Sequence, residues 1–241
     1  MSASPGLPAT AVVVGASGGI GAAFVRHLAA RPTIGDLHAW SRRGGVSGQP
    51  DRATASRVDL RDEASIARLA LGVREPRLVI VASGILRTSD GAGPEKSWRD
   101  LDAVRLAEIM AINAIGPALV AKHLMPRMPR SGRVVFAALS ARVGSIGDNR
   151  LGGWYGYRAS KAALNQFVRT LAVEAQRVNR ESVCVALHPG TVATALSADF
   201  AGDRDVVAAD VAAGNLLGVI ERLAPADTGG LFAWDGSRIP Y

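Results

Sequence analysis

The chain alternates short apolar runs with longer stretches in which apolar residues recur at helical spacing. The runs predict strands at residues 10–15, 37–41, 53–58, 78–82, 133–139, 182–187 and 230–234, and the stretches predict helices at 20–30, 63–72, 98–128, 155–179 and 208–223. The runs are apolar throughout, which is typical of parallel strands that are covered on both faces. The pattern therefore predicts an α/β fold of Rossmann type: a doubly wound, mostly parallel seven-stranded sheet with helices on both faces.

Length and composition favour a single globular domain, residues 1–241, because nothing in the chain resembles a linker, a repeat or a low-complexity segment. The longest apolar candidate for a membrane span, residues 101–125, is interrupted by Arg105, Glu108, Asn113 and Lys122, so we expect no contact with a membrane. The N-terminus lacks the basic and apolar regions of a signal peptide, which makes a cytoplasmic location the default expectation. The one cysteine, Cys184, excludes an intrachain disulfide, and we expect no metal site.

The net charge of +7 comes mainly from arginine. A basic chain can bind nucleic acid, but here the arginines are spread along the chain, without runs or interleaved aromatic residues. We therefore expect no nucleic-acid partner, and an anionic cofactor together with a solvated surface accounts for the charge.

A glycine-rich loop follows the first predicted strand and leads directly into the first predicted helix. Gly15, Gly19 and Gly21 form a Gly-xxx-Gly-x-Gly pattern, in which glycine permits a tight turn and the close approach of a pyrophosphate. The free N–H groups at the start of a helix attract phosphates. The loop therefore predicts a dinucleotide site made of Gly15, Ser17, Gly18, Gly19, Ile20 and Gly21, with a plain turn as the alternative.

The ends of the second and third predicted strands bear on the choice of dinucleotide. The second strand ends in Ser41-Arg42-Arg43, without the carboxylate that would bind the ribose 2′-hydroxyl of NAD. Guanidinium groups there suit a 2′-phosphate, so we predict NADP(H), with NAD(H) as the alternative; the arginines could also be plain surface residues. After the third strand, at Asp59-Leu60, a carboxylate could reach the adenine amino group, or Asp59 could cap a helix.

Tyr157 and Lys161 stand four residues apart at the beginning of a predicted helix, which places both side chains on one helical face. A free phenol has a pKa near ~10, too high for efficient acid–base catalysis at neutral pH. A neighbouring ammonium, helped by a positive nicotinamide ring, would lower it. The pair thus predicts an acid–base centre for hydride transfer, and an incidental surface pair is the alternative.

Together, the glycine loop, the Tyr-xxx-Lys pair and the order of elements resemble the short-chain dehydrogenase/reductase superfamily. More narrowly, residues 139–146, 153–158 and 234–241 look like the subgroup that contains C-factor-type proteins and sniffer-type carbonyl reductases. The resemblance implies a carbonyl–alcohol oxidoreductase with a small-molecule substrate, assembled as a homodimer or homotetramer through the helices near residues 103–125 and 157–178. A dinucleotide-binding cell–cell signalling protein with little or no turnover is the alternative.

The resemblance also assigns residues that the local patterns do not. Ser83 and Gly84 match a segment that lines the adenine ribose in this family, although two asparagines of the family pattern are replaced. Asn113 matches an asparagine that relays protons through water to the lysine. The turn at Pro189 and Gly190, with Val192 and Thr194, matches one that meets the nicotinamide carboxamide.

The family's substrate-binding serine has two candidates in this sequence. Ser140 precedes Tyr157 by 17 positions and Ser145 by 12, and we predict Ser140, with Ser145 in reserve; a loop serine bonded to the main chain is the alternative. The resemblance places the substrate between residues 147–153 and 195–207, where Trp154, Ala198 and Phe200 suggest an apolar pocket without naming a compound.

Overall fold

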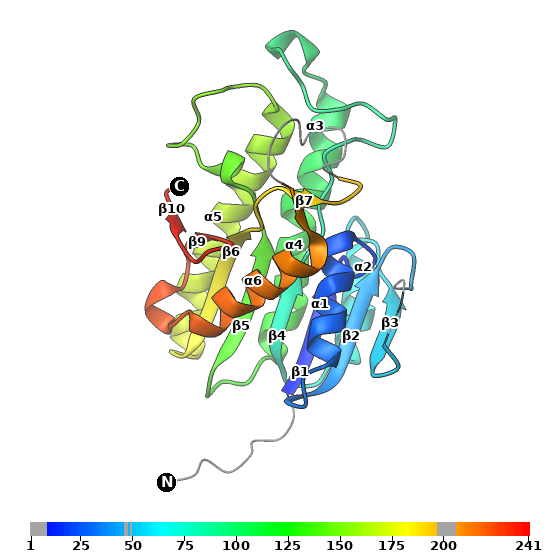
Figure 1. Ribbon diagram of the computed structural model, residues 1–241, viewed down its shortest axis with the longest axis vertical. Coiled ribbons are helices and arrows are strands. Elements are labelled where there is room, and N and C mark those ends of the chain that lie inside the picture. Colours follow the sequence, from blue (N-terminus) through cyan, green and yellow to red (C-terminus); the bar gives the residue numbers. More distant parts are fainter. Residues whose placement is uncertain (1–8, 46–47, 49, 197–205) are drawn as a thin grey trace.

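A computed structural model describes residues 9–45, 48, 50–196 and 206–241. Its main sheet contains β1 (Ala9–Val14), β2 (Ile34–Ser41), β3 (Ala53–Arg57), β4 (Pro76–Val81), β5 (Val134–Leu139), β6 (Ser182–His188), β9 (Leu231–Ala233) and β10 (Arg238–Ile239). They lie in the order β10-β9-β6-β5-β4-β1-β2-β3 (Figure 1). Every neighbouring pair is parallel except β9 and β10. The predicted Rossmann-type fold is therefore confirmed.

The predicted number of seven strands in this sheet is wrong, because the described residues form eight. The missed strand, β10, pairs antiparallel with β9 through only two residues, too few for any periodicity to appear in the sequence. A separate pair, β7 (Val192–Ala193) and β8 (Val207–Ala208), was missed for the same reason.

The helices are α1 (Gly19–Ala29), α2 (Glu63–Leu71), α3 (Ala103–Met110), α4 (Gly116–Leu124), α5 (Tyr155–Val178) and α6 (Ala209–Arg222), with a π-helical turn at Ala111–Ile115. The single helix predicted for residues 98–128 is wrong at its start and in its middle. The Asp102 side chain accepts hydrogen bonds from the N–H groups of Val104 and Arg105, so it caps α3 and starts the helix at Ala103. The π turn then separates α3 from α4.

Within the described residues, the stretch Ala103–Arg127 has the length and apolar composition of a membrane-spanning helix, with a mean hydropathy of 1.5. Its α4 part packs against α2, α5 and β4, and Val120 and Leu124 are completely buried there. Packing within the fold buries 33% of the most apolar 18 residues of this stretch, and Val104 and Ile115 remain exposed.

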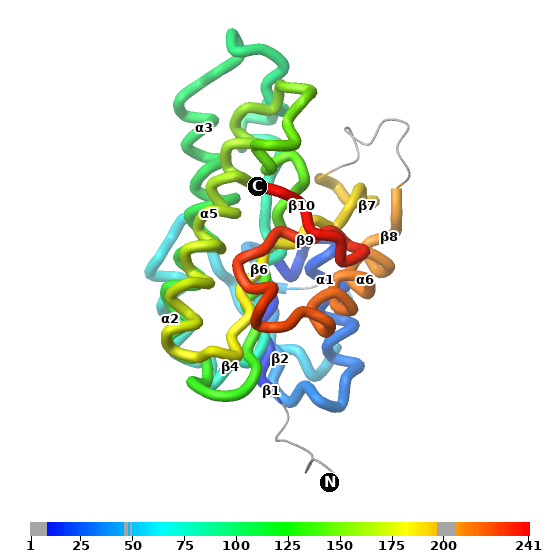
Figure 2. The backbone as a smooth tube through the Cα atoms, turned by 90° about the vertical axis from the view of Figure 1, so that its left-hand side faces the viewer, coloured from blue at the N-terminus to red at the C-terminus, as the bar shows by residue number. Residues whose placement is uncertain are grey.

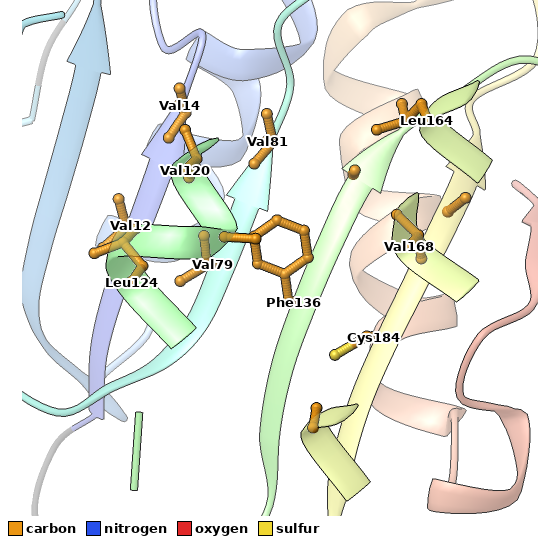
Figure 3. Close-up of a cluster of buried hydrophobic side chains, with 14 of the residues drawn as sticks. Val12, Val14, Val79, Val81, Val120, Leu124, Phe136, Leu164, Val168 and Cys184 are labelled. Carbon is orange, nitrogen blue, oxygen red and sulfur yellow. The ribbon is translucent and has the colours of Figure 1, made fainter. Parts of the chain in front are cut away.

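Two helical layers cover the sheet, with α1 and α6 on one face and α2, α4 and α5 on the other (Figure 2). Alternate residues of each strand enter opposite layers: Val13 packs with α1 and α6, whereas Val12 and Val14 pack with α4. Figure 3 shows the second layer, with the Phe136 ring between α4 and α5. Burial on both faces explains why the central strands β1, β4, β5 and β6 are mostly apolar, whereas the edge strand β3 is partly exposed and mostly polar.

The strand order reverses between β1 and β4, where the chain crosses from one half of the sheet to the other. In open α/β sheets, a crevice forms outside the carboxyl ends of the strands at such a switch point. The loops that follow β1, β2, β4, β5 and β6 all emerge at this edge, and they carry most of the predicted site residues.

Candidate active site

A cleft of about 470 Å³ lies at the carboxyl edge of the sheet. Residues from segments far apart in the sequence meet in its wall. Those predicted for a dinucleotide site that line it are Gly15, Ser17, Gly18, Gly19, Ile20, Gly21, Ser41, Arg42, Arg43, Asp59, Leu60, Ser83, Gly84, Tyr157, Lys161, Pro189 and Thr194. The tertiary structure thus gathers these residues around one space.

The glycine loop is packed so tightly that two of its positions admit only glycine. Gly15 has a φ of 85°, and a β-carbon there would lie 2.7 Å from the main-chain nitrogen of Ser83. A β-carbon on Gly21 would lie 2.1 Å from the Gly15 oxygen. The loop therefore makes a sharp turn that brings the start of α1 to the cleft.

The start of α1 is suited to an anion. Its N-cap is Gly18, which supplies no side-chain hydrogen bond, and its first turn contains no acidic residue. The N–H groups and the positive end of the helix dipole therefore face the cleft without a competing carboxylate on the helix itself. Gly19 lies against Thr194 from the loop after β6, since a β-carbon at Gly19 would be 2.8 Å from Thr194 Cγ2.

Three arginine residues, Arg42, Arg43 and Arg61, line the cleft. Arg42 and Arg43 are exposed on the turn after β2, which is closed by a 3.1 Å hydrogen bond from Gly44 N–H to Ser41 Oγ. Arg61, which sequence reasoning missed, also lines the cleft and binds Asp59 through both carboxylate oxygens, at 3.3 and 3.0 Å. These hydrogen bonds hold the pKa of Asp59 below its usual value.

Asp59 does not cap a helix. The N-cap of α2 is Asp62, whose carboxylate accepts a 3.0 Å hydrogen bond from Ala64 N–H. The capping alternative for Asp59 is therefore wrong. Its carboxylate belongs to the ion pair with Arg61 in the cleft wall.

Ser83 and Gly84 follow β4 in the middle of the cleft. The Ser83 hydroxyl is buried, and among the described residues it has no hydrogen-bond partner. A β-carbon on Gly84 would lie 3.4 Å from Lys161 Nζ, so the glycine leaves space beside the ammonium. An unpaired buried hydroxyl is costly, and a bound polar group would satisfy it. This observation, with the glycine cradle, fits a dinucleotide.

Tyr157 and Lys161 lie on one face of the first two turns of α5, and both are buried. Lys161 Nζ donates a 2.7 Å hydrogen bond to the main-chain oxygen of Leu139, the last residue of β5. The same nitrogen lies 5.8 Å from the centre of the Tyr157 ring. The spacing of four residues thus places both groups at the cleft, as predicted.

Burial shifts the pKa values of this pair in opposite directions. It raises the pKa of Tyr157 to about 12 and lowers the pKa of Lys161 to about 8, because each group loses the water that would stabilise its charge. In the protein alone, burial therefore raises the phenol pKa, whereas the sequence predicted that a neighbouring ammonium would lower it. At neutral pH the phenol is protonated and the amine carries its charge.

Asn113 is completely buried in the π turn, where its side chain bonds the main chain of Ile85 in both directions. Oδ1 accepts from Ile85 N–H at 2.7 Å, and Nδ2 donates to Ile85 oxygen at 2.9 Å and to Ser160 Oγ at 3.1 Å. These bonds attach the loop after β4 to α5. The water relay to Lys161 stays a prediction, and Ile112 is the residue of this turn that lines the cleft.

The two candidate serines lie in different surroundings. Ser140 lines the cleft, and its hydroxyl donates a 2.7 Å hydrogen bond to Asn165 Oδ1. Ser145 is buried, and its hydroxyl accepts a 3.2 Å hydrogen bond from Asp148 N–H within a turn. The placement favours Ser140.

The turn after β6 reaches the cleft through Pro189 and Thr194. Gly190 has a φ of 78° and packs on the Trp234 ring, and Val192 is buried in β7. These two residues therefore shape the turn beneath the cleft wall. Ala195 and Leu196 continue the wall, and Ala198 and Phe200 lie outside the described residues.

A family model described as short chain dehydrogenase matches residues 9–205. The chain belongs to the short-chain dehydrogenase family. As a member, it is an enzyme of the oxidoreductase class, and the match extends from β1 beyond α5 and the turn after β6.

Relatives of this dehydrogenase include proteins of the predicted subgroup. C-signal of Myxococcus xanthus is 34% identical over 155 residues, which cover 63% of this chain and 90% of C-signal. The structure of an NADPH-bound carbonyl reductase from chicken fatty liver superposes with a TM-score of 0.85 at 26% identity, covering 98% of this chain and 95% of that one. Carbonyl reductase Sniffer of Drosophila melanogaster has a TM-score of 0.83 at 22% identity, covering 98% and 100% of the two chains, and this likeness concerns the fold.

Several cleft residues of the dehydrogenase escaped sequence reasoning: Val14, Val58, Arg61, Ala82, Ile85, Ile112 and Leu139. Most are apolar residues at or next to strand ends, where the sequence resembles any other strand. Arg61 had a signal, because it follows Asp59-Leu60 at the end of the third strand, beside the predicted adenine site.

Proposed function

We propose that this short-chain dehydrogenase interconverts a carbonyl and an alcohol by hydride transfer with NADP(H). The observation that carries the proposal is the buried pair of Tyr157 and Lys161, which lines the same cleft as Ser140 and the glycine loop. A tyrosine beside an ammonium is suited to exchange a proton with a carbonyl oxygen. Binding alone would not require such a pair in the cleft wall.

Different residues of the cleft would bind different parts of the cofactor. The N-terminus of α1 would hold the pyrophosphate, and the unpaired hydroxyl of Ser83 would bind a ribose. Arg42 and Arg43 would bind a 2′-phosphate, which supports NADP(H) over NAD(H). The NADPH bound to the chicken carbonyl reductase supports the same choice. When bound, the nicotinamide supplies or accepts the hydride.

The pKa values of the pair suit the reductive direction. At neutral pH Tyr157 is protonated, so its hydroxyl can donate a proton to the carbonyl oxygen as negative charge develops there. Lys161, charged below about pH 8, stabilises the phenolate left behind. The Ser140 hydroxyl, now bonded to Asn165, would orient the same oxygen.

A panel of aldehydes and ketones tests the proposal. Purified protein is mixed with NADPH and each compound, and cofactor oxidation is followed by absorbance. We expect oxidation with at least one class of carbonyl compound, and slower oxidation with NADH. Failure with every compound would contradict the proposed reaction.

The likeness to C-signal supports a second candidate, a dinucleotide-binding signalling protein with little or no turnover. This candidate predicts tight NADPH binding and no oxidation in the same panel. Binding measured by NADPH fluorescence, beside the turnover assay, separates the two functions.

We also propose a homo-oligomer that uses α4 and α5. A groove of about 400 Å³ runs between these helices, and the Phe167 side chain is partly exposed in it. Sedimentation velocity is expected to give a mass of two or four chains, whereas a monomer at micromolar concentration would contradict this part of the proposal.

A further inference from the structure

The chain takes an unusual path into the helix that carries the acid–base pair. Gly152, Gly153 and Trp154 have φ values of 65°, 63° and 53°, three left-handed residues in succession. Glycine adopts this conformation freely, but for a bulky residue such as Trp154 it costs about 1–3 kcal/mol. Such a conformation persists only where the surroundings hold it.

The buried residue Glu95, from the loop between β4 and α3, holds this turn at two points. Its main-chain oxygen accepts a 2.6 Å hydrogen bond from Trp154 N–H. Its carboxylate Oε2 accepts a 3.0 Å hydrogen bond from Gly156 N–H. One residue therefore binds the main chain immediately before α5 and inside its first turn.

The carboxylate takes the place of a helix cap. Trp154, the N-cap of α5, makes no side-chain capping bond, and the first turn of α5 contains no acidic residue. Glu95 satisfies one of the first N–H groups and places negative charge at the positive helix end. Glycine at position 156 leaves room for this carboxylate, because a β-carbon there would lie 2.9 Å from Glu95 Oε1.

The left-handed turn also sets a ring contact. The Trp154 indole meets the Tyr157 ring edge-on, with the ring centres 6.1 Å apart and an angle of 74° between the planes. Edge-to-face pairs have a preferred geometry, so the indole restricts the orientation of the phenol. The main-chain twist at Trp154 is what brings the indole to this position.

The loop that carries Glu95 is itself anchored. Asp100 accepts hydrogen bonds from the N–H groups of Lys96 and Ser97, at 3.1 and 2.9 Å. Earlier in the loop, the Asp90 carboxylate pairs with Arg105 on α3 at 2.8 Å. These interactions hold the loop in place, and with it the position of Glu95 relative to α5.

We propose that Glu95 is a positioning residue for the reaction: it holds the strained Trp154 turn and the first turn of α5, and so aims the Tyr157 hydroxyl into the cleft. The inference rests on the proposed function. Glu95 acts through the main chain of α5 and the indole, and it is not placed in the cleft wall.

Two variants of Glu95 separate positioning from charge. Glu95→Gln keeps an oxygen that can accept from Gly156 N–H, whereas Glu95→Ala removes it. We expect kcat to fall about 10- to 100-fold in Glu95→Ala, with the KM for NADPH within about twofold, and to recover in Glu95→Gln to within about threefold of the wild type. The matched control is Glu181→Ala, which removes an exposed carboxylate that accepts from Gly132 N–H at 2.9 Å; its kcat should not change.

Amide hydrogen exchange gives a readout that does not depend on turnover. Exchange in a peptide covering residues 152–160 should be faster in Glu95→Ala and unchanged in Glu95→Gln. Unchanged kcat and exchange in Glu95→Ala would overturn the proposal, as would equal losses of kcat in both variants. If the wild type turns over no carbonyl compound, the proposed function fails, and the exchange data alone then decide whether Glu95 holds this turn.

Discussion

The Lys161 ammonium is fixed between two elements: Nζ donates to the main-chain oxygen of Leu139 at 2.7 Å and lies 5.8 Å from the centre of the Tyr157 ring. Leu139 ends β5, whereas Tyr157 and Lys161 belong to α5. The distance between the amine and the phenol is therefore set by how the helix packs on the sheet, in addition to their spacing along the helix.

Tyr157→Phe removes the proposed proton donor and leaves the ring, including its contact with Trp154. We expect kcat to fall by about 10²–10⁴-fold, the range typical of a lost general acid. The Kd for NADPH, measured by fluorescence titration, should stay within about threefold. Turnover at the wild-type rate would remove Tyr157 from the mechanism.

Lys161→Met should abolish turnover and stabilise the fold at neutral pH. Burial lowers the pKa of Lys161 from 10.5 to about 8, so the unfolded chain binds the proton more tightly than the folded chain does. Below pH 8 this difference lowers the free energy of unfolding of the wild type by up to about 3 kcal/mol. The destabilisation disappears as the pH rises towards 10.5. Urea unfolding at pH 7 and pH 10 measures it.

The exposed residue Lys96, which lines neither the cleft nor the groove between α4 and α5, supplies the control for that experiment. Lys96→Met should change the free energy of unfolding by less than about 1 kcal/mol. If both methionine variants behave alike, burial of the Lys161 charge is not what destabilises the wild type.

Replacing Arg42 and Arg43 with alanine should raise the KM for NADPH at least tenfold and the KM for NADH less than threefold. The reason is that a 2′-phosphate forms charge-assisted hydrogen bonds with guanidinium groups, and NADH lacks that phosphate. Initial rates with the two cofactors measure the difference. Arg31→Ala, which removes an arginine paired with Glu221 away from the cleft, is the control. Equal losses for both cofactors would contradict the 2′-phosphate assignment.

Gly21→Ala and Gly18→Ala form a matched pair in the glycine loop. A β-carbon at Gly21 would lie 2.1 Å from the Gly15 oxygen, whereas at Gly18 the distance to that oxygen is 3.4 Å. We therefore expect Gly21→Ala to lose at least about 2 kcal/mol of stability together with NADPH binding, and Gly18→Ala to keep its stability. Thermal unfolding with and without NADPH checks both; equal stability of the two variants would refute the close packing.

His188 should make the fold sensitive to acid. Burial, helped by Arg142, lowers the pKa of His188 from 6.5 to about 4, and its Nδ1 atom is buried without a partner among the described residues. The unfolded chain therefore takes up this proton first, and stability should fall by up to about 3 kcal/mol as the pH drops from 6.5 to 4. The His188→Asn variant lacks this titration, so its free energy of unfolding should fall by about 3 kcal/mol less than that of the wild type over the same pH range. Urea unfolding across this range measures the difference. Identical pH profiles would exclude His188 as the cause.

Much of the fold could be predicted because its signals are local. A strand that is buried on both faces is a short run of mostly apolar residues. The turn at Gly15 and Gly21 has no room for side chains and therefore requires glycine. Both features can be recognised from consecutive residues in the sequence. The two-residue strand β10 and the π turn at Ala111–Ile115 show no such local signal. Both form because of contacts with segments that pack against them, and such contacts leave no periodic pattern of apolar residues in the sequence.

By itself, the sequence determined seven strands of the main sheet, the helices α1, α2, α5 and α6, the glycine turn and the helical face shared by Tyr157 and Lys161, because each of these signals lies in a short continuous segment. Only the tertiary structure decided that Ser140 lines the cleft while Ser145 closes a turn, that Asn113 bonds Ile85, and that Glu95 meets the start of α5. These contacts join residues separated by up to 61 positions, and they exist only once the sheet and its two helical layers have packed.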